Sequence, residues 1–435
     1  MADRRAQRST DLVVVVNLFP RLSETFVLQE LLELERRGAR LHLVAVRHPE
    51  ELVQLEGVER LKAEVEYLPE VAPFALNRVV QMRIRTAHAA LFLEAPKRYL
   101  NALGEITASP DFSRTALRRS VLLAHRLLQL GSPPVYVHFA HKPTTLARFA
   151  ARLAGVPYGI SAHAKDIWLT PPAELTRKVR AADVVLTCTR GGQAHLERLA
   201  GGHTPVELVY HGVDTEALVP PEVAAPDPVM LSVGRLVEKK GYSTLLRAAA
   251  RIRDDGFAFE LRIVGEGPEW AALQRLVHEL ELGDRVSFLG PLTESELREQ
   301  YAQAQVFALA CRELESGDRD GIPNVILEAM ACGLPVASTT SSGVAEAVVD
   351  GKCGLLVPQD DPESLASALA RLLVDRELRQ RLGSDARACA VERFDRTLHL
   401  ARAVDVLRAA GLLPGDAMDD AARMHAPEQR SMVAA

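Results

Sequence analysis

The chain has 435 residues, of which 48% are hydrophobic and 25% charged, and its formal net charge is −5. These proportions are typical of a folded globular protein and exclude a disordered chain, a collagen-like repeat and a small disulfide scaffold. The charge creates no overall field for nucleic acid, so we expect no nucleic-acid partner. At about 150 residues per domain, the length predicts two or three domains.

Five short, apolar and largely β-branched runs in the first half predict buried parallel strands. They cover residues 12–16, 41–46, 135–139, 158–162 and 184–188. Segments of helical period, such as 25–37 and 142–154, lie between them and end at a glycine. Strands that alternate with helices predict a doubly wound α/β sheet. Four prolines within 219–229 then predict an interdomain linker.

The alternation of strands and helices restarts after this linker. Strands are predicted at 229–233, 260–264, 286–289, 306–310 and 335–338, and helices at 243–254, 269–280, 294–304, 325–332, 362–373 and 385–410. We therefore expect two Rossmann-like domains, 1–220 and 221–390, that face a central cleft, where strand ends and helix N-termini would meet a ligand. A helix at 391–412 is expected to pack back on the first domain, and the polar tail, 413–435, to be disordered.

The cysteines and the first apolar run indicate the cellular compartment in which we expect the protein. The five cysteines are odd in number and widely spaced, so they indicate neither a disulfide framework nor a zinc site and fit a reducing cytoplasm. The apolar run at 12–16 is too short for a signal peptide or a membrane span. We expect a cytoplasmic protein that is soluble or bound peripherally to the inner face of the cytoplasmic membrane.

The strand at 229–233 runs into the first motif, Ser232-Val-Gly-Arg-Leu-Val-Glu-Lys-Lys-Gly241. Its glycines permit a tight loop, across which Arg235 and Lys240 place two cations. Arginine forks onto two phosphate oxygens and lysine supplies a compact charge, so the pair suits a diphosphate. The chain has only eight lysines against 44 arginines, an imbalance typical of codon bias, which adds weight to the lysines in this loop. The alternative is a surface loop with solvated cations, which the position between a buried strand and a helix disfavours.

In a second motif, residues 317–336, the carboxylates of Asp320 and Glu328 lie on either side of a turn. Asn324 is expected to be the N-cap, so that Asp320 lies on the loop and Glu328 in the second helical turn. The free N–H groups of the first turn would seat a phosphate, and the carboxylates could accept hydrogen bonds from sugar hydroxyls. The alternative is a capped core helix with one incidental glutamate.

The two motifs together resemble family 4 of the retaining, nucleotide-sugar-dependent glycosyltransferases, which have the GT-B fold. The resemblance rests on Gly-Arg-Leu-x-x-x-Lys-Gly and on an acidic residue followed by Glu-Ala-Met-Ala-x-Gly-x-Pro-Val, and it extends to Ser161-Ala-His-Ala-Lys-Asp166, His211-Gly-Val-Asp214 and Val264-Gly-Glu-Gly-Pro268. Residues 19–26 and 317–324 are similar to the branch that builds colanic acid and other bacterial exopolysaccharides.

By position, the resemblance implies that Arg235 and Lys240 bind the donor diphosphate, Glu328 the ribose and Asp320 the transferred sugar. His163 would face the donor sugar near its anomeric carbon, in an orienting and electrostatic role. The other implied donor contacts are Gly234, Gly265, Gly321, Ile322, Asn324 and Val325, and the implied acceptor-side contacts are Ser23, Glu24, Thr25, Lys165 and Asp166. The resemblance also makes 1–220 the acceptor-binding domain and 221–390 the nucleotide-sugar-binding domain.

Two departures from the family pattern affect these assignments. Position 320 is Asp where many members have Glu, which is one methylene longer, so its reach to the sugar is open. Ser23-Glu24-Thr25 replaces the common Gly-Gly of the first loop, which alters contacts to the acceptor or the donor phosphate.

Three patterns imitate other sites. Asp318-Arg-Asp320 resembles a metal-binding Asp-x-Asp motif, but Arg235 and Lys240 can neutralise the diphosphate, so we expect no metal. His138-Phe-Ala-His141 lacks the further ligands that a metal site needs. Gly265-Glu-Gly-Pro268 starts like a dinucleotide fingerprint but has Trp270 where the third glycine belongs.

A basic region lies between residues 75 and 126, where nine Arg or Lys residues stand against three acids. Its interleaved apolar residues are Val79, Val80, Met82, Ile84, Leu91, Phe92 and Leu93. This composition suits peripheral contact with an anionic bilayer, where a lipid-linked acceptor would be met. The alternative is a solvated helical face that packs on its own domain.

We therefore expect transfer of a sugar from a UDP- or GDP-sugar to a saccharide acceptor, lipid-linked, with retention of anomeric configuration, in bacterial exopolysaccharide or cell-surface glycan biosynthesis. The nucleotide sugar is a substrate, and no cofactor is expected. Two alternatives stay open at this point: a nucleotide-sugar epimerase of the same fold, and a catalytically weak nucleotide-sugar-binding scaffold.

Overall fold

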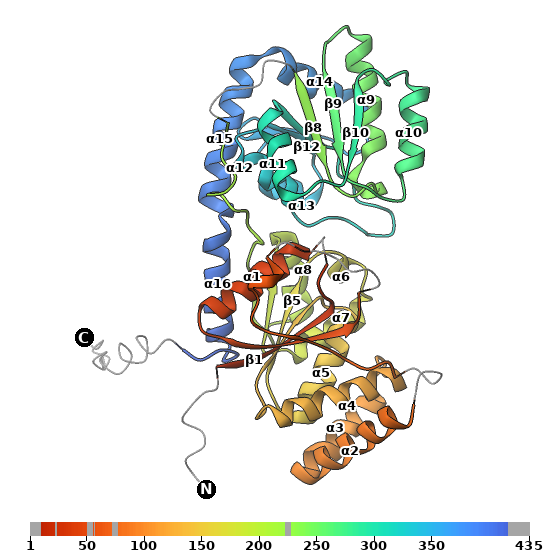
Figure 1. Ribbon diagram of the computed structural model, residues 1–435, viewed down its shortest axis with the longest axis vertical. Coiled ribbons are helices and arrows are strands. Elements are labelled where there is room, and N and C mark those ends of the chain that lie inside the picture. Colours follow the sequence, from red (N-terminus) through yellow and green to blue (C-terminus); the bar gives the residue numbers. More distant parts are fainter. Residues whose placement is uncertain are drawn as a thin grey trace, which may run out of the picture. The chain divides into compact units, whose positions relative to one another are not determined.

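The computed structural model describes residues 10–21, 24–49, 55, 57–71, 77–221 and 228–415. Seven strands form the first sheet in the order β3-β2-β1-β4-β5-β6-β7 (Figure 1). They are β1 (Asp11–Leu18), β2 (Arg40–Arg47), β3 (Val65–Tyr67), β4 (Val135–His138), β5 (Tyr158–Ala162), β6 (Val184–Thr187) and β7 (Val206–Leu208). Every residue of β4, β5 and β6 is buried, which explains their continuous apolar runs.

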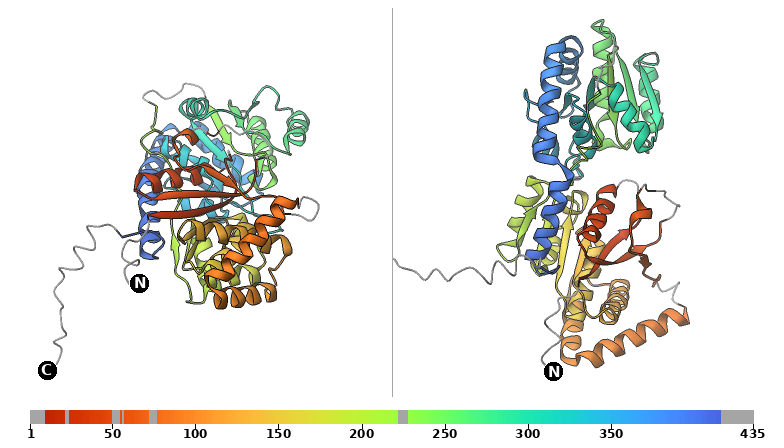
Figure 2. Two further views of the ribbon diagram at one scale, coloured as in Figure 1. Left: turned by 60° about the horizontal axis from the view of Figure 1, so that its bottom comes forward. Right: turned by 60° about the vertical axis from the view of Figure 1, so that its left-hand side comes forward.

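The helices that accompany this sheet lie between its strands along the chain. They are α1 (Thr25–Arg36), α2 (Arg78–Glu94), α3 (Pro96–Ala108), α4 (Arg114–Gln129), α5 (Lys142–Ala154), α6 (Lys165–Trp168), α7 (Pro172–Ala181) and α8 (Arg190–Ala200). Helix α4 packs on α5, and α2 packs on α4, so α2 lies one layer farther from the sheet (Figure 2).

Six parallel strands form the second sheet in the order β10-β9-β8-β11-β12-β13. They are β8 (Val229–Val233), β9 (Glu260–Val264), β10 (Val286–Gly290), β11 (Val306–Leu309), β12 (Val336–Thr339) and β13 (Gly354–Val357). The helices are α9 (Tyr242–Asp254), α10 (Trp270–Glu279), α11 (Glu294–Gln303), α12 (Asn324–Ala331), α13 (Ser342–Ala347), α14 (Pro362–Val374), α15 (Arg376–Phe394) and α16 (Arg396–Ala409). The predicted fold class, two parallel α/β sheets of the Rossmann type, is confirmed.

Each sheet has a topological switch point, where successive connections run to opposite sides. It lies between β1 and β4 in the first sheet and between β8 and β11 in the second. In doubly wound folds, ligands bind at the carboxyl ends of the strands at such points. The loops after β8 and β11 are therefore the first place to look for a binding site in the second sheet.

The chain divides into two compact units, and the division passes through the first sheet. One unit comprises the chain up to Ser161 with Arg177–Val185 and the chain from Arg402 on, and the other comprises Ala162–Thr176 and Leu186–Ala401. The domain boundary predicted at residue 220 stays a prediction. Of the predicted tail, residues 416–435 lie outside the described residues, as does 222–227 of the predicted linker.

The predicted helix over 385–410 is two helices, α15 and α16, which meet at Asp395. The Asp395 carboxylate accepts from the backbone N–H of Thr397, and it also takes the hydroxyl of Thr215 as a donor. The side chain thus caps the start of α16, as a turn-forming residue can, and interrupts the helix there. Among the described residues, no helix is both long and apolar enough to cross a membrane.

Candidate functional site

The loops that follow β8 and β11 are packed backbone against backbone. A Cβ on Gly241 would lie 1.8 Å from the carbonyl oxygen of Ala310, and the φ of Gly241 is +66°. Only glycine combines this conformation with such a close approach. The first motif therefore folds onto the loop after β11, which carries the second motif.

This contact brings two lysines to two aspartates. Lys240 Nζ lies 2.7 Å from Asp320 Oδ2, and Lys239 Nζ lies 3.0 Å from Asp320 Oδ1. Lys239 Nζ also lies 3.0 Å from Asp318 Oδ1. Lys240 and Asp320 are each predicted from the sequence, but their pairing and the role of Lys239 as a bridge between both aspartates come only from the structure.

The ion pairs fix the charge state of this cluster. Burial favours the neutral form of Asp320, but Lys240 and Lys239 outweigh it and hold the pKa of the carboxyl below its ordinary value. Burial likewise acts to lower the pKa of Lys240, and the attraction of Asp320 overcomes it, so this pKa is raised. Both groups are therefore charged at neutral pH, and Asp320 and Asp318 together balance the two lysines.

Arg235 stands at the edge of the same loop, and its side chain is exposed. Among the residues that the structure describes, it forms no ion pair. Its loop is held in place by the next motif: a Cβ on Gly265 would lie 2.2 Å from the carbonyl oxygen of Gly234, and Leu236 N–H donates to Glu266 at 2.9 Å. Gly234 and Gly265, both predicted donor contacts, thus pack backbone against backbone next to Arg235.

The N-terminus of α12 lies next in the second motif, and its N-cap is Pro323 with no side-chain hydrogen bond. The prediction that Asn324 is the N-cap is wrong by one residue, because Pro323 has the extended conformation of a cap and Asn324 is already helical. The uncapped first turn leaves backbone N–H groups available to an anion. Ile322 and Val325 flank this turn and are half-buried.

Glu328 projects from the second turn of α12, where its spacing predicts it to be. Its Oε2 accepts a hydrogen bond from the Tyr301 hydroxyl at 2.9 Å. Burial raises the pKa of Glu328, an effect that the Tyr301 hydrogen bond partly offsets. Tyr301 was not predicted, since nothing in a single tyrosine of α11 indicates which carboxylate it meets.

His163 follows β5, and its loop is shaped by Asp166. The backbone N–H groups of His163 and Ala164 donate to Asp166 Oδ1, each at 3.1 Å, so the predicted acceptor-side residue Asp166 holds the loop by its carboxylate. Lys165, the other predicted acceptor-side residue in this loop, is exposed at the start of α6. A Cβ on Gly321 would lie 3.9 Å from that of Ala164, so the predicted sugar-binding loops meet.

One histidine pair in this region was not predicted. His163 Nδ1 lies 3.0 Å from His211 Nε2, and burial lowers the pKa of His211 to about 4, helped by the nearby His399 and opposed by Asn324. The ring of His211 is thus neutral at physiological pH. Its motif, His211-Gly-Val-Asp214, is visible in the sequence, but no contact was predicted for it.

Among the described residues, one group has the donors and spacing that a metal ion needs. Ligand atoms of His163, Cys188 and His211 lie within 4.8 Å of one another. Burial raises the pKa of the Cys188 thiol, which donates to the carbonyl oxygen of His163. A protonated thiol is a poor ligand, and hydrogen bonds already account for the arrangement.

The remaining predicted acceptor-side residues lie before and at the start of α1. Glu24 pairs with Arg21 at 2.6 Å, and Thr25 is the exposed first residue of the helix. Ser23 lies outside the described residues.

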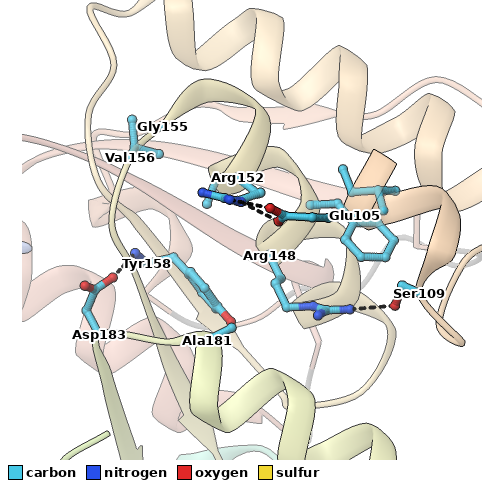
Figure 3. Close-up of a pocket in the computed structure, with 12 residues that line it drawn as sticks. Glu105, Ser109, Arg148, Arg152, Gly155, Val156, Tyr158, Ala181 and Asp183 are labelled. Atoms are coloured by element: carbon cyan, nitrogen blue, oxygen red, sulfur yellow. Dashed lines mark hydrogen bonds and ion pairs between the residues drawn. The ribbon is translucent and has the colours of Figure 1, made fainter. Parts of the chain in front are cut away.

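A pocket of about 440 Å³ in the first unit contains none of the predicted residues. Figure 3 shows the residues that line it, with Arg152 paired to Glu105, Arg148 turned to Ser109, and Tyr158 N–H donating to Asp183. It lies at the amino ends of β5 and β6, the opposite edge of the sheet from the one where doubly wound folds bind ligands.

Comparison with known proteins decides the family. Residues 215–388 match the family described as "Glycosyl transferases group 1". The chain is 32% identical over 300 residues to a GDP-mannose-dependent alpha-(1-6)-phosphatidylinositol monomannoside mannosyltransferase of Mycobacterium tuberculosis, an alignment that covers 65% of this chain and 76% of that protein. The chain belongs to the group 1 glycosyl transferases.

One further relative and two solved structures are also similar to this chain. A Salmonella typhimurium protein named for colanic acid biosynthesis, glycosyltransferase WcaL, is 29% identical over 368 residues, covering 81% of this chain and 88% of that protein. HepE of Anabaena, solved in complex with UDP and glucose, has a TM-score of 0.66 at 18% identity over 92% of this chain and 99% of that one. The sucrose-phosphate synthase of Thermosynechococcus elongatus has a TM-score of 0.69 at 19% identity over 92% and 98%. The GT-B fold and glycosyltransferase activity are confirmed.

Proposed function

We propose that this glycosyltransferase transfers a sugar from a UDP- or GDP-sugar, with retention of anomeric configuration, to a lipid-linked saccharide in bacterial exopolysaccharide or cell-surface glycan biosynthesis. The observation that carries the proposal is the charge arrangement at the second switch point. Lys239 and Lys240 share Asp320, and Arg235 stands exposed beside them. The relatives named for colanic acid and for GDP-mannose support the glycan and the donor class.

The roles follow from chemistry at these positions. The leaving nucleoside diphosphate gains negative charge, which Arg235, Lys240 and the open N-terminus of α12 would stabilise as fixed positive groups. Glu328 would accept the ribose hydroxyls, and Asp320, already charged, those of the sugar. His163 would orient the sugar, its ring being held by His211.

One assay tests this function against its alternatives. The protein is incubated with UDP- and GDP-sugars and a lipid-linked saccharide, and products are identified by mass spectrometry, with NMR of the anomeric proton for the linkage. A transferred sugar of retained configuration is expected. Isomerised donor without transfer would indicate an epimerase, binding without turnover would indicate a scaffold, and inversion would overturn the stereochemistry proposed here.

Peripheral contact with an anionic membrane is the second part of the proposal, and helices α2 and α3 support it. Val79, Met82 and Leu93 of α2 are 68%, 64% and 78% exposed, and Leu100 of α3 is 56% exposed. Exposed cations flank them: Arg78, Arg83, Arg85 and Lys97. Apolar side chains between cations are typical of surfaces that insert shallowly into anionic bilayers.

In the structure, the basic region has residues that face outward and residues that pack inward. Val80, Ile84 and Leu91 are buried and form the inner face of α2, so only part of the apolar set faces outward. Arg98 is half-buried and donates to the carbonyl oxygen of Leu153 at 3.2 Å. A test of membrane binding should therefore change Arg78, Arg83 and Arg85 rather than Arg98.

Sedimentation with liposomes of anionic and of neutral lipid tests this contact. We expect Arg78→Glu/Arg83→Glu/Arg85→Glu and, separately, Met82→Ser/Leu93→Ser to reduce binding to anionic liposomes at least tenfold. The matched control is Val374→Ser/Leu398→Ser, which removes side chains that are 65% and 58% exposed elsewhere. Equal sedimentation of all variants would contradict membrane contact through α2.

A further inference from the structure

The loop between β4 and α5 lies at the switch point of the first sheet, and buried hydrogen bonds hold its backbone in place. Phe139 has a φ of +73°, which is uncommon for a residue with a side chain. Lys178, fully buried on α7, donates from Nζ to the carbonyl oxygens of Ala140 and His141 at 3.0 and 2.9 Å. Such local strain, stabilised by surrounding contacts, is common at functional sites.

The strand order brings cations to the edge where His141, the last residue of this loop, lies: β2 and β4 both flank β1, and Arg47 ends β2 in register with Leu18. The groups that act on its ring are Lys178, Lys142, Arg21 and Arg47, from four different segments of the first unit, and all are positive. Arg21 is balanced by Glu24. Arg47, at the end of β2, and Lys142, at the start of α5, are exposed and form no ion pair with any described residue.

The ring of His141 stacks on the ring of Phe139. Its Nδ1 is buried and has no hydrogen-bond partner among the described residues, and the side chain does not cap α5. Burial, followed by the surrounding cations, lowers its pKa to about 4. Like charges brought together in a folded protein repel one another, a cost that a bound anion would remove.

We propose that Arg47, His141 and Lys142 form a subsite for an oxyanion of the acceptor, on a loop that the buried Lys178 holds in place. The phosphate of a lipid carrier and the carboxylate of an acidic sugar share the chemistry required. The subsite lies at the carboxyl edge of the first sheet, as acceptor binding would require, and this inference rests on the proposed function. The N-terminus of the 13-residue helix α5 adds its partial positive charge there.

The test follows the ring of His141 by NMR in full-length protein with labelled histidines, with the signal assigned by His141→Gln. Saturating UDP or GDP first occupies the donor site, because pyrophosphate would also bind there. Inorganic pyrophosphate and glucuronate are then titrated separately. We expect one of them to shift the His141 signal and to raise its pKa by about one unit or more, since an anion favours the charged ring.

The variant Arg47→Gln/Lys142→Gln should weaken this binding at least tenfold. The control Arg60→Gln/Lys62→Gln removes two exposed cations of the same unit at the other edge of the sheet and should bind as the parent does. Response to pyrophosphate alone identifies a phosphate subsite, and response to glucuronate alone a carboxylate subsite.

Two results would overturn the inference: no response of His141 to either probe, or equal binding by the Arg47/Lys142 variant. Calorimetry of UDP and GDP binding on the same samples separates this from a failure of the proposed function. Normal nucleotide binding with an unresponsive His141 refutes only the subsite, whereas lost nucleotide binding would count against the donor site.

Discussion

At the scale of single residues, Lys240 is the side chain on which most of the proposed chemistry depends, because it faces both Asp320 and the expected diphosphate. We expect Lys240→Ala to lower kcat/KM about 100-fold or more, the usual loss when one fixed donor to a developing charge is removed. Product formation by mass spectrometry measures this effect. The control is Lys352→Ala, an exposed lysine outside the site. Activity within threefold of the parent would show that Lys240 is not part of the donor site.

Glu328 is a second residue at this scale, and its substitution tests stability and donor binding by two independent measurements. Burial raises its pKa in the folded protein, so ionisation of this carboxyl weakens folding as the pH rises through that titration. Glu328→Gln keeps an acceptor for Tyr301 and has no such titration. We expect the variant to gain stability relative to the parent in urea unfolding as the pH rises above the ordinary range of a glutamate, while its KM for the donor rises at least tenfold. A purely structural glutamate would change stability without changing KM.

At the scale of elements, the position of the lysines depends on how closely the loops after β8 and β11 pack. Gly241→Ala would place a Cβ 1.8 Å from the Ala310 carbonyl oxygen. The left-handed conformation alone costs alanine about 1–2 kcal/mol, and the clash adds to it, so we expect more than about 3 kcal/mol in urea unfolding together with loss of nucleotide binding.

Gly256 provides the matched control for that substitution. Its φ is +83°, and a Cβ there would meet no atom within 4 Å. Gly256→Ala should therefore show only the conformational cost and bind nucleotide normally. Equal destabilisation by both substitutions would mean that the close packing at Gly241 does not contribute to the free energy of unfolding.

At the scale of the whole molecule, two compact units with separate switch points predict a local response to the donor nucleotide. A ligand at 100 times its Kd stabilises its binding unit by about 2.7 kcal/mol. UDP or GDP should therefore slow hydrogen exchange over 229–241 and 324–331, and leave 135–160 of the first unit unchanged. Mass spectrometry of the exchanged peptides measures this protection. Protection confined to 135–160 would contradict the prediction, because it would show that the nucleotide binds the first unit.

Most strands could be predicted from the sequence because parallel strands buried on both faces need continuous apolar runs, which local composition reveals. The strands β3, β7 and β13 and the helix α6 have only three or four residues each, and all four were missed. The break at Asp395 was missed because it depends on a contact with Thr215, which is far away along the chain.

The sequence by itself determined the two motifs and the chemical types they place after strands: Arg235 and Lys240 on one loop, Asp320 and Glu328 on another. Only the tertiary structure decided their partners, namely Lys239 with both aspartates, Tyr301 with Glu328, and His211 with His163. The physical reason is that ion pairs and hydrogen bonds form between loops brought together by strand order, and strand order places residues far apart in sequence at one edge of a sheet. The cations around His141 come from four separate segments for the same reason.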